Sequence, residues 1–127
     1  MLHIDPLSRI PVYEQVITQF SRLIVTGVLK PQEAVPSVRG LATSLGINPN
    51  TILKAYGELA ARGIFCAVPG KGYFVASDAR QAIAGTEEKR LSELYSLAEQ
   101  IALAGIPEQT LLAAVRDACA AAAKKKE

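Results

Sequence analysis

The sequence is poor in the residues that build most catalytic and metal sites. It has no tryptophan, one histidine and two cysteines among 127 residues. The histidine and the distant Cys66 and Cys119 provide neither a zinc site nor a disulfide framework. We expect each cysteine to be a small buried apolar residue. The chain also offers no Ser–His–Asp set and no paired carboxylates, so we expect no enzyme, no metal and no cofactor.

Long apolar runs and strong net charge are also absent. No stretch approaches the roughly 18 apolar residues of a membrane span, and the first residues lack the features of a signal peptide. We therefore expect a cytoplasmic protein without membrane association. The net charge of +2 is too small to identify a nucleic-acid-binding protein. Residues 34–75 nevertheless carry four basic side chains and one acidic one, so we expect an anionic partner to bind there.

Half of the residues are hydrophobic, which is sufficient for a folded core. The first apolar pattern begins after Pro11 and keeps a helical spacing as far as Ile24. It predicts an amphipathic helix that ends at Gly27. The next segment, residues 28–36, contains two prolines and is expected to be a loop.

Two short helices joined by a tight turn are predicted next. Ser37 has the position of an N-cap for a helix that ends before Gly46. Asn48 is the next N-cap and is followed by proline, so a second helix starts after only three residues and continues to Gly63. Two helices joined by a tight turn with a glycine are typical of a helix-turn-helix.

The second of these helices is predicted to have two different sides. At 100° per residue, its apolar residues, such as Ile52 and Leu59, share one side. Asn50, Lys54 and Gly57 lie on the opposite side. A helix face that carries an amide, an ammonium group and a small residue fits the major groove of DNA.

Two β-prone runs, residues 64–68 and 73–75, flank the sequence Pro69-Gly70-Lys71-Gly72. They predict a hairpin with a basic tip. The spacing of a nucleotide-binding glycine loop is missing there.

A polar connection is expected at 77–86. Two helices follow, and their apolar stripes need a partner, most simply a second copy of the chain.

Residues 36–75 resemble the winged helix-turn-helix domain of the GntR family of bacterial transcription regulators. The motifs are PSVRGLATSLG, NPNTILKAYGEL and GKGYFV, and PVYEQV at 11–16 resembles the family's first helix. NPNT and the short tail resemble the YtrA-type subgroup. The resemblance implies a mainly α-helical fold with a small β-wing. The DNA-binding domain would occupy residues 1–77, and a linker with a two-helix dimerisation region would occupy 78–127.

The resemblance also implies a set of DNA-binding residues. Ser37 would contact phosphate and Arg39 a guanine, whose O6 and N7 accept two hydrogen bonds from one arginine. The start of the recognition helix would contribute phosphate and base contacts, and the wing tip would enter the minor groove. The implied set is Ser37, Arg39, Asn48, Asn50, Thr51, Lys54, Gly70 and Lys71.

Several positions depart from the family pattern. Gln32 and Ala34 replace the usual glycine and basic residue, and Gly40 replaces an acidic residue. The wing strand at 66–69 lacks the arginines that relatives often carry. Fewer cations release fewer counterions from DNA, so we expect a low non-specific affinity.

These observations predict a homodimeric DNA-binding transcription regulator. We expect a repressor that reads a palindromic operator through the wing and a recognition helix at about 49–63, since a two-fold dimer presents two equivalent helices to two half-sites. The alternative is a winged-helix module that binds a protein partner rather than DNA. The sequence leaves open whether a small-molecule effector exists.

Overall fold

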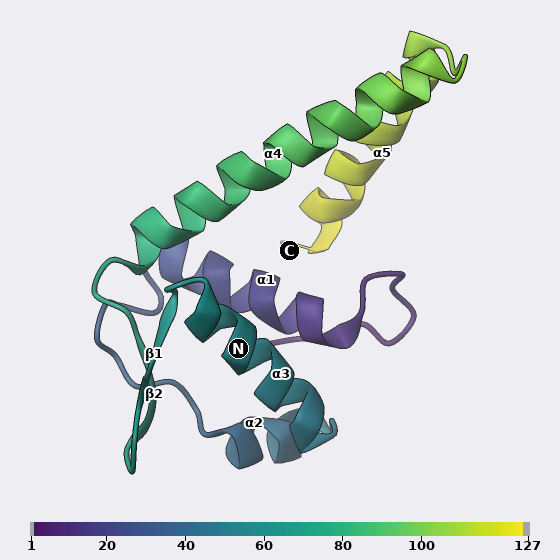
Figure 1. The fold of residues 1–127 in the computed structure, drawn as a ribbon. Helices are drawn as coiled ribbons and strands as arrows, with labels where there is room; N and C mark the ends of the chain where they lie inside the picture. Colours follow the sequence, from purple (N-terminus) through teal and green to yellow (C-terminus); the bar gives the residue numbers. More distant parts are fainter. Residues whose placement is uncertain (1, 126–127) are drawn as a thin grey trace. The chain divides into compact units, whose positions relative to one another are not determined.

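The computed structural model describes residues 2–125, which form five helices and two strands (Figure 1). This mainly α-helical architecture with one hairpin is the predicted fold class. The chain divides into two compact units, Met1–Thr86 and Glu87–Glu127. None of the helices in the described part combines the length and apolar character that a membrane crossing requires. The elements are α1 (Val12–Val25), α2 (Val38–Leu45), α3 (Pro49–Ala61), β1 (Phe65–Val68), β2 (Gly72–Val75), α4 (Ala79–Leu103) and α5 (Glu108–Lys125).

Capping residues set the boundaries of α2 and α3, as predicted. The Oγ of Ser37 accepts a hydrogen bond from the backbone N–H of Gly40 at 3.0 Å. Gly46 ends α2 with a φ of 67°. The Oδ1 of Asn48 accepts from the N–H of Asn50 at 2.8 Å and starts α3. These bonds give partners to backbone N–H groups in the first turns of the two helices, which would otherwise have none within the helix. The turn between α2 and α3 therefore needs only three residues.

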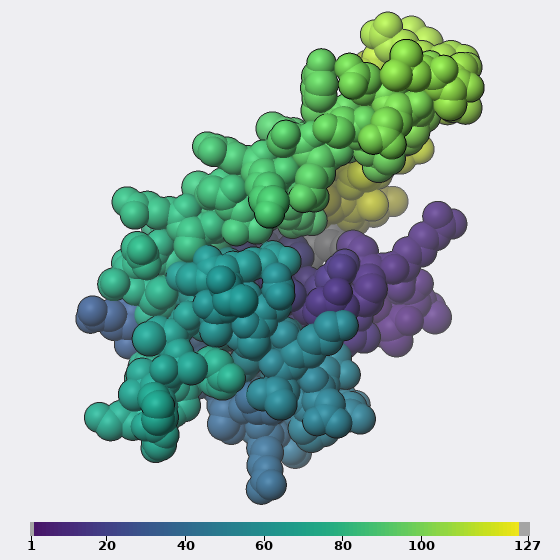
Figure 2. Space-filling view, viewed as in Figure 1, coloured from purple at the N-terminus to yellow at the C-terminus, as the bar shows by residue number. Residues whose placement is uncertain are grey.

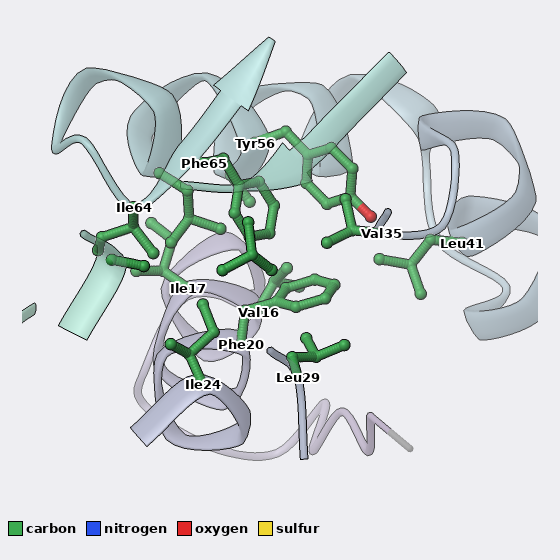
Figure 3. Packing of buried hydrophobic residues seen from close by; sticks show 14 of the residues in the cluster. Val16, Ile17, Phe20, Ile24, Leu29, Val35, Leu41, Tyr56, Ile64 and Phe65 are labelled. Carbon is green, nitrogen blue, oxygen red and sulfur yellow. The ribbon is translucent and has the colours of Figure 1, made fainter. Parts of the chain in front are cut away.

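The core of the first unit lies between α1, α3 and the hairpin. Figure 3 shows side chains of α1 pointing toward Tyr56 and Phe65. The ring centroids of Phe20, Tyr56 and Phe65 lie 5.2–5.6 Å apart with edge-to-face geometry. Burial raises the pKa of the Tyr56 phenol, whose hydroxyl donates to the carbonyl of Pro36 at 2.7 Å. The bond ties α3 to the residue that precedes α2.

The hairpin has the predicted position and a defined turn. β1 and β2 are antiparallel, with Val68 opposite Gly72. The N–H of Lys71 donates to the carbonyl of Val68 at 2.9 Å, and Gly70 has a φ of 77°. Proline followed by a residue with positive φ is typical of a type II turn.

A third segment extends this small sheet, although residues 28–36 were expected to be a simple loop. The N–H of Val35 donates to the carbonyl of Tyr73, and the N–H of Val75 donates to the carbonyl of Glu33. An isolated bridge joins Ala34 to the same strand, β2. The chain therefore enters α2 directly from the edge of the wing.

The prediction of a connection at 77–86 is wrong, because α4 already begins at Ala79. Ala79 and Ile83 are buried in the core of the first unit. The Nε of Arg80 donates to the carbonyl of Ile24, at the end of α1, at 3.4 Å. Ile83 is the only large apolar residue in these turns, so the sequence has no clear apolar period that would predict a helix there.

The prediction that the cysteines are buried is also wrong. Both Cys66 and Cys119 are exposed thiols in this chain. Cys66 follows the buried Phe65 in β1, and successive residues of a strand point to opposite faces. Cys119 lies on α5, none of whose side chains is buried within this chain as far as residue 124.

The N-terminal segment is held along α1 by two glutamines. Gln15 is 8% exposed, and its amide binds both backbone groups of Asp5 at 2.9 and 3.0 Å and the carbonyl of Ile10 at 2.8 Å. Gln19, one turn later, binds both backbone groups of His3. Each amide accepts from the N–H and donates to the carbonyl of one residue, as a neighbouring β-strand would. The backbone groups of His3 and Asp5 are therefore hydrogen-bonded.

Candidate nucleic-acid interface

Ser37 and Arg39 are exposed at the start of α2. The Ser37 hydroxyl serves as the helix cap, and the preceding carbonyl of Pro36 is bound by Tyr56. Arg39 forms no hydrogen bond or ion pair with any residue that the structure describes. Its guanidinium group thus keeps all five donors for an external acceptor beside a helix N-terminus, where anions are favoured.

The start of α3 presents Asn48 and Asn50 at the surface, and Thr51 is half-buried. Lys54 is exposed, but its ammonium group lies 3.8 Å from the centroid of the Tyr13 ring on α1. Sequence reasoning missed this cation–π contact, because nothing in the local pattern connects a residue of the first helix with the recognition helix.

The tip of the hairpin exposes Gly70 and Lys71. Apart from the neighbouring residues of the chain, no heavy atom lies within 4 Å of the place where a Cβ on Gly70 or on Gly72 would stand. The tip is therefore open to solvent. Figure 2 shows the hairpin, in teal, projecting from the body of the first unit, with α2, in blue, at the surface of the same face.

Electrostatics favour an anion on this part of the molecule. Within residues 34–75 the only carboxylate is that of Glu58, and it pairs with Arg62 at 2.9 Å. Arg39, Lys54 and Lys71 have no carboxylate partner among residues 2–125. The predicted residues thus lie on three parts of one unit, the start of α2, the first turns of α3 and the wing tip, and three cations there have no carboxylate partner among residues 2–125 (Figure 1).

One exposed residue of α3 was not among the predicted contacts. Leu53 is 50% exposed, although it is a large apolar residue. It follows Ile52, which is fully buried. At 100° per residue Leu53 lies beside the polar side of the helix, and this position of a large apolar residue was the signal in the sequence that could have identified it.

The sequence model described as "Bacterial regulatory proteins, gntR family" matches residues 12–75, half of the chain. This range runs from the start of α1 to the end of β2. The chain belongs to the GntR family. The match covers the helix-turn-helix and the wing together, so it includes every position that the sequence predicted as a DNA contact.

Individual relatives agree with this assignment. The HTH-type transcriptional repressor YtrA of Bacillus subtilis is 43% identical over 83 residues, 65% of this chain and 64% of that protein. The chain thus spans a little under two thirds of that relative. The structure of YtrA from Sulfolobus acidocaldarius, a GntR-family transcription factor, has a TM-score of 0.58 and 35% identity. It covers 72% of this chain and 97% of its own.

A structure of AraR(DBD) in complex with operator ORX1 is also similar. It has a TM-score of 0.53 and 36% identity, and covers 59% of this chain and 93% of its own. Together these findings confirm the predicted winged helix-turn-helix fold and the resemblance to the GntR family and its YtrA-type members.

Proposed function

We propose that this GntR-family chain is a cytoplasmic DNA-binding transcription regulator, a repressor that binds a palindromic operator as a homodimer. The observation that carries the proposal is the set of uncompensated cations, Arg39, Lys54 and Lys71, on a helix-turn-helix and its wing. The likeness to a domain solved on its operator supports DNA as the partner rather than a protein.

The proposed roles follow from the chemistry of each position. Arg39 donates to guanine O6 and N7, and Asn50 and Thr51 meet base edges in the major groove. Ser37 and Asn48 cap their helices and contact phosphate beside the helix N-termini. Lys54 also contacts phosphate, and Gly70 with Lys71 enters the minor groove. Phosphate contacts set the register, and base contacts specify the sequence.

A homodimer is proposed because the second unit does not bury its own apolar residues. Of residues 87–124, not one is buried. Tyr95 is 70% exposed and Leu103 is 82% exposed, and five other large apolar residues of α4 and α5 are at least 39% exposed. Exposed large apolar residues in such number favour an association site. A second copy of the same two helices would cover it with a matching surface.

The dimer proposal is tested by placing a charge on this surface. Tyr95→Glu should shift the full chain from dimer to monomer in sedimentation, because a carboxylate would be buried without a partner. Ser96 is also exposed on α4, and its neighbours three and four positions away are all polar, so Ser96→Glu adds the same charge away from the apolar residues and should remain dimeric. Equal dissociation of both variants would contradict the assigned surface.

The DNA proposal is tested by fluorescence anisotropy of the full chain on DNA from upstream of its own gene. A scrambled duplex serves as competitor, and the salt concentration is varied. We expect binding that survives the competitor, with a salt slope corresponding to several phosphates. Weak and sequence-independent binding would overturn the proposal and favour a protein partner.

A further inference from the structure

Leu53 is an exposed apolar side chain within the polar face of α3. The other large apolar residues of the helix, Ile52, Tyr56 and Leu59, are fully buried. Leu53 is half exposed, so it contributes little to the core. Its neighbours on the exposed surface at positions three before and four after are Asn50 and Gly57.

The surroundings leave Leu53 open to a ligand. A helical side chain leans toward the N-terminus of its helix, so Leu53 lies over the first turn, where Asn50 is exposed. One turn later, no atom apart from the adjoining backbone of α3 and the two neighbouring residues lies within 4 Å of the position where a Cβ on Gly57 would stand. The surface on that side of Leu53 is therefore open, in agreement with its 50% exposure.

The chemistry of DNA offers one strong match to such a side chain. Leucine has no donor or acceptor, and the apolar group that the major groove displays is the 5-methyl group of thymine. We infer that Leu53 is a specificity-determining residue that contacts a thymine methyl group in each half-site. This inference rests on the proposed function, because it requires α3 to lie in the major groove.

The neighbouring residue sharpens the expected sequence. Asparagine binds adenine through N6 and N7, and Asn50 is one turn from Leu53 on the same face. The base pairs beneath the start of α3 are therefore A·T pairs, one recognised by an amide and another by a methyl contact. Cytosine at the second position would lack the methyl group and lose the contact.

The experiment removes the methyl group without changing base pairing. The operator is first located by footprinting with the full chain, and each thymine in a half-site is then replaced by deoxyuridine. At one position we expect a weakening of about fourfold, the effect of one methyl group returned to water. Leu53→Ala should bind the thymine and deoxyuridine duplexes equally, and Leu53→Met should keep the difference.

The control is an exposed leucine outside the helix-turn-helix. Leu7→Ala truncates a side chain that is 92% exposed outside α3, and it should keep the wild-type sensitivity to deoxyuridine. If no thymine replacement weakens wild-type binding while the operator is still preferred, the inference is overturned and the proposed function stands. Sensitivity that persists in Leu53→Ala also overturns it. Absence of any operator preference overturns the proposed function itself.

Discussion

The ammonium group of Lys54 lies 3.8 Å from the centroid of the Tyr13 ring. A cation of the recognition helix α3 is thus held by an aromatic face of α1. The Tyr13 hydroxyl donates to Oε1 of Glu14 at 3.3 Å. This arrangement restricts the flexible lysine, so less rotamer freedom would be lost in the phosphate contact that the proposed function assigns to it.

The contact between Lys54 and Tyr13 should be measurable as a coupling energy. We expect Tyr13→Leu and Lys54→Met to be non-additive by about 0.5–1 kcal/mol in the free energy of unfolding, the usual range for an exposed cation–π pair. Urea unfolding of the two single variants and the double variant gives this value. Additive effects would show that the ring does not hold the lysine.

Arg39 should determine sequence preference rather than general affinity. Loss of two hydrogen bonds to guanine in Arg39→Ala should cost about 1–3 kcal/mol on the operator and little on random DNA. Arg39→Lys keeps the charge but not the bidentate geometry, so it should lose operator preference and retain random binding. Fluorescence anisotropy with the operator duplex and with a random duplex measures the two affinities. Equal losses on both would show that Arg39 only contacts phosphate.

Gln15 should stabilise the fold far more than Gln19. Gln15→Met keeps the length of the side chain but removes its bonds to Asp5 and Ile10. We expect a loss of about 1–3 kcal/mol, because partly buried backbone groups lose their partners. Gln19→Met breaks bonds that are exposed to water, so it should cost less. Similar losses in urea unfolding would argue against a special role for Gln15.

Gln32 has a backbone conformation that favours glycine. It has a φ of 68° and follows Pro31 in a turn where the N–H of Glu33 donates to the carbonyl of Lys30. Gln32→Gly should raise the free energy of unfolding by about 0.5 kcal/mol, because relief of strain exceeds the entropy that glycine adds to the unfolded chain. Thermal melting provides the comparison.

A matched control separates strain from other effects at this turn. Glu33 is the next residue, pairs with β2 and has no positive φ. Glu33→Gly should therefore lower the free energy of unfolding by about 0.5–1 kcal/mol. If both glycine variants lower stability, the positive φ of Gln32 carries no cost.

Much of the fold could be predicted because its signals are local. Ser37 and Asn48 cap helices by bonds to residues two or three positions away. The Pro69-Gly70 turn closes over four residues. The DNA contacts were predicted from the family motifs, and they stay predictions, although seven of the eight positions are exposed and Thr51 is half-buried.

The sequence by itself determined the helix-turn-helix, the hairpin and the family, because capping, turn formation and periodic burial depend on neighbours in the chain. Only the tertiary structure decided that Tyr13 holds Lys54, that Gln15 holds the N-terminal segment, and that Ala79 and Ile83 complete the first core. These features depend on packing between segments far apart in sequence, which no local pattern records.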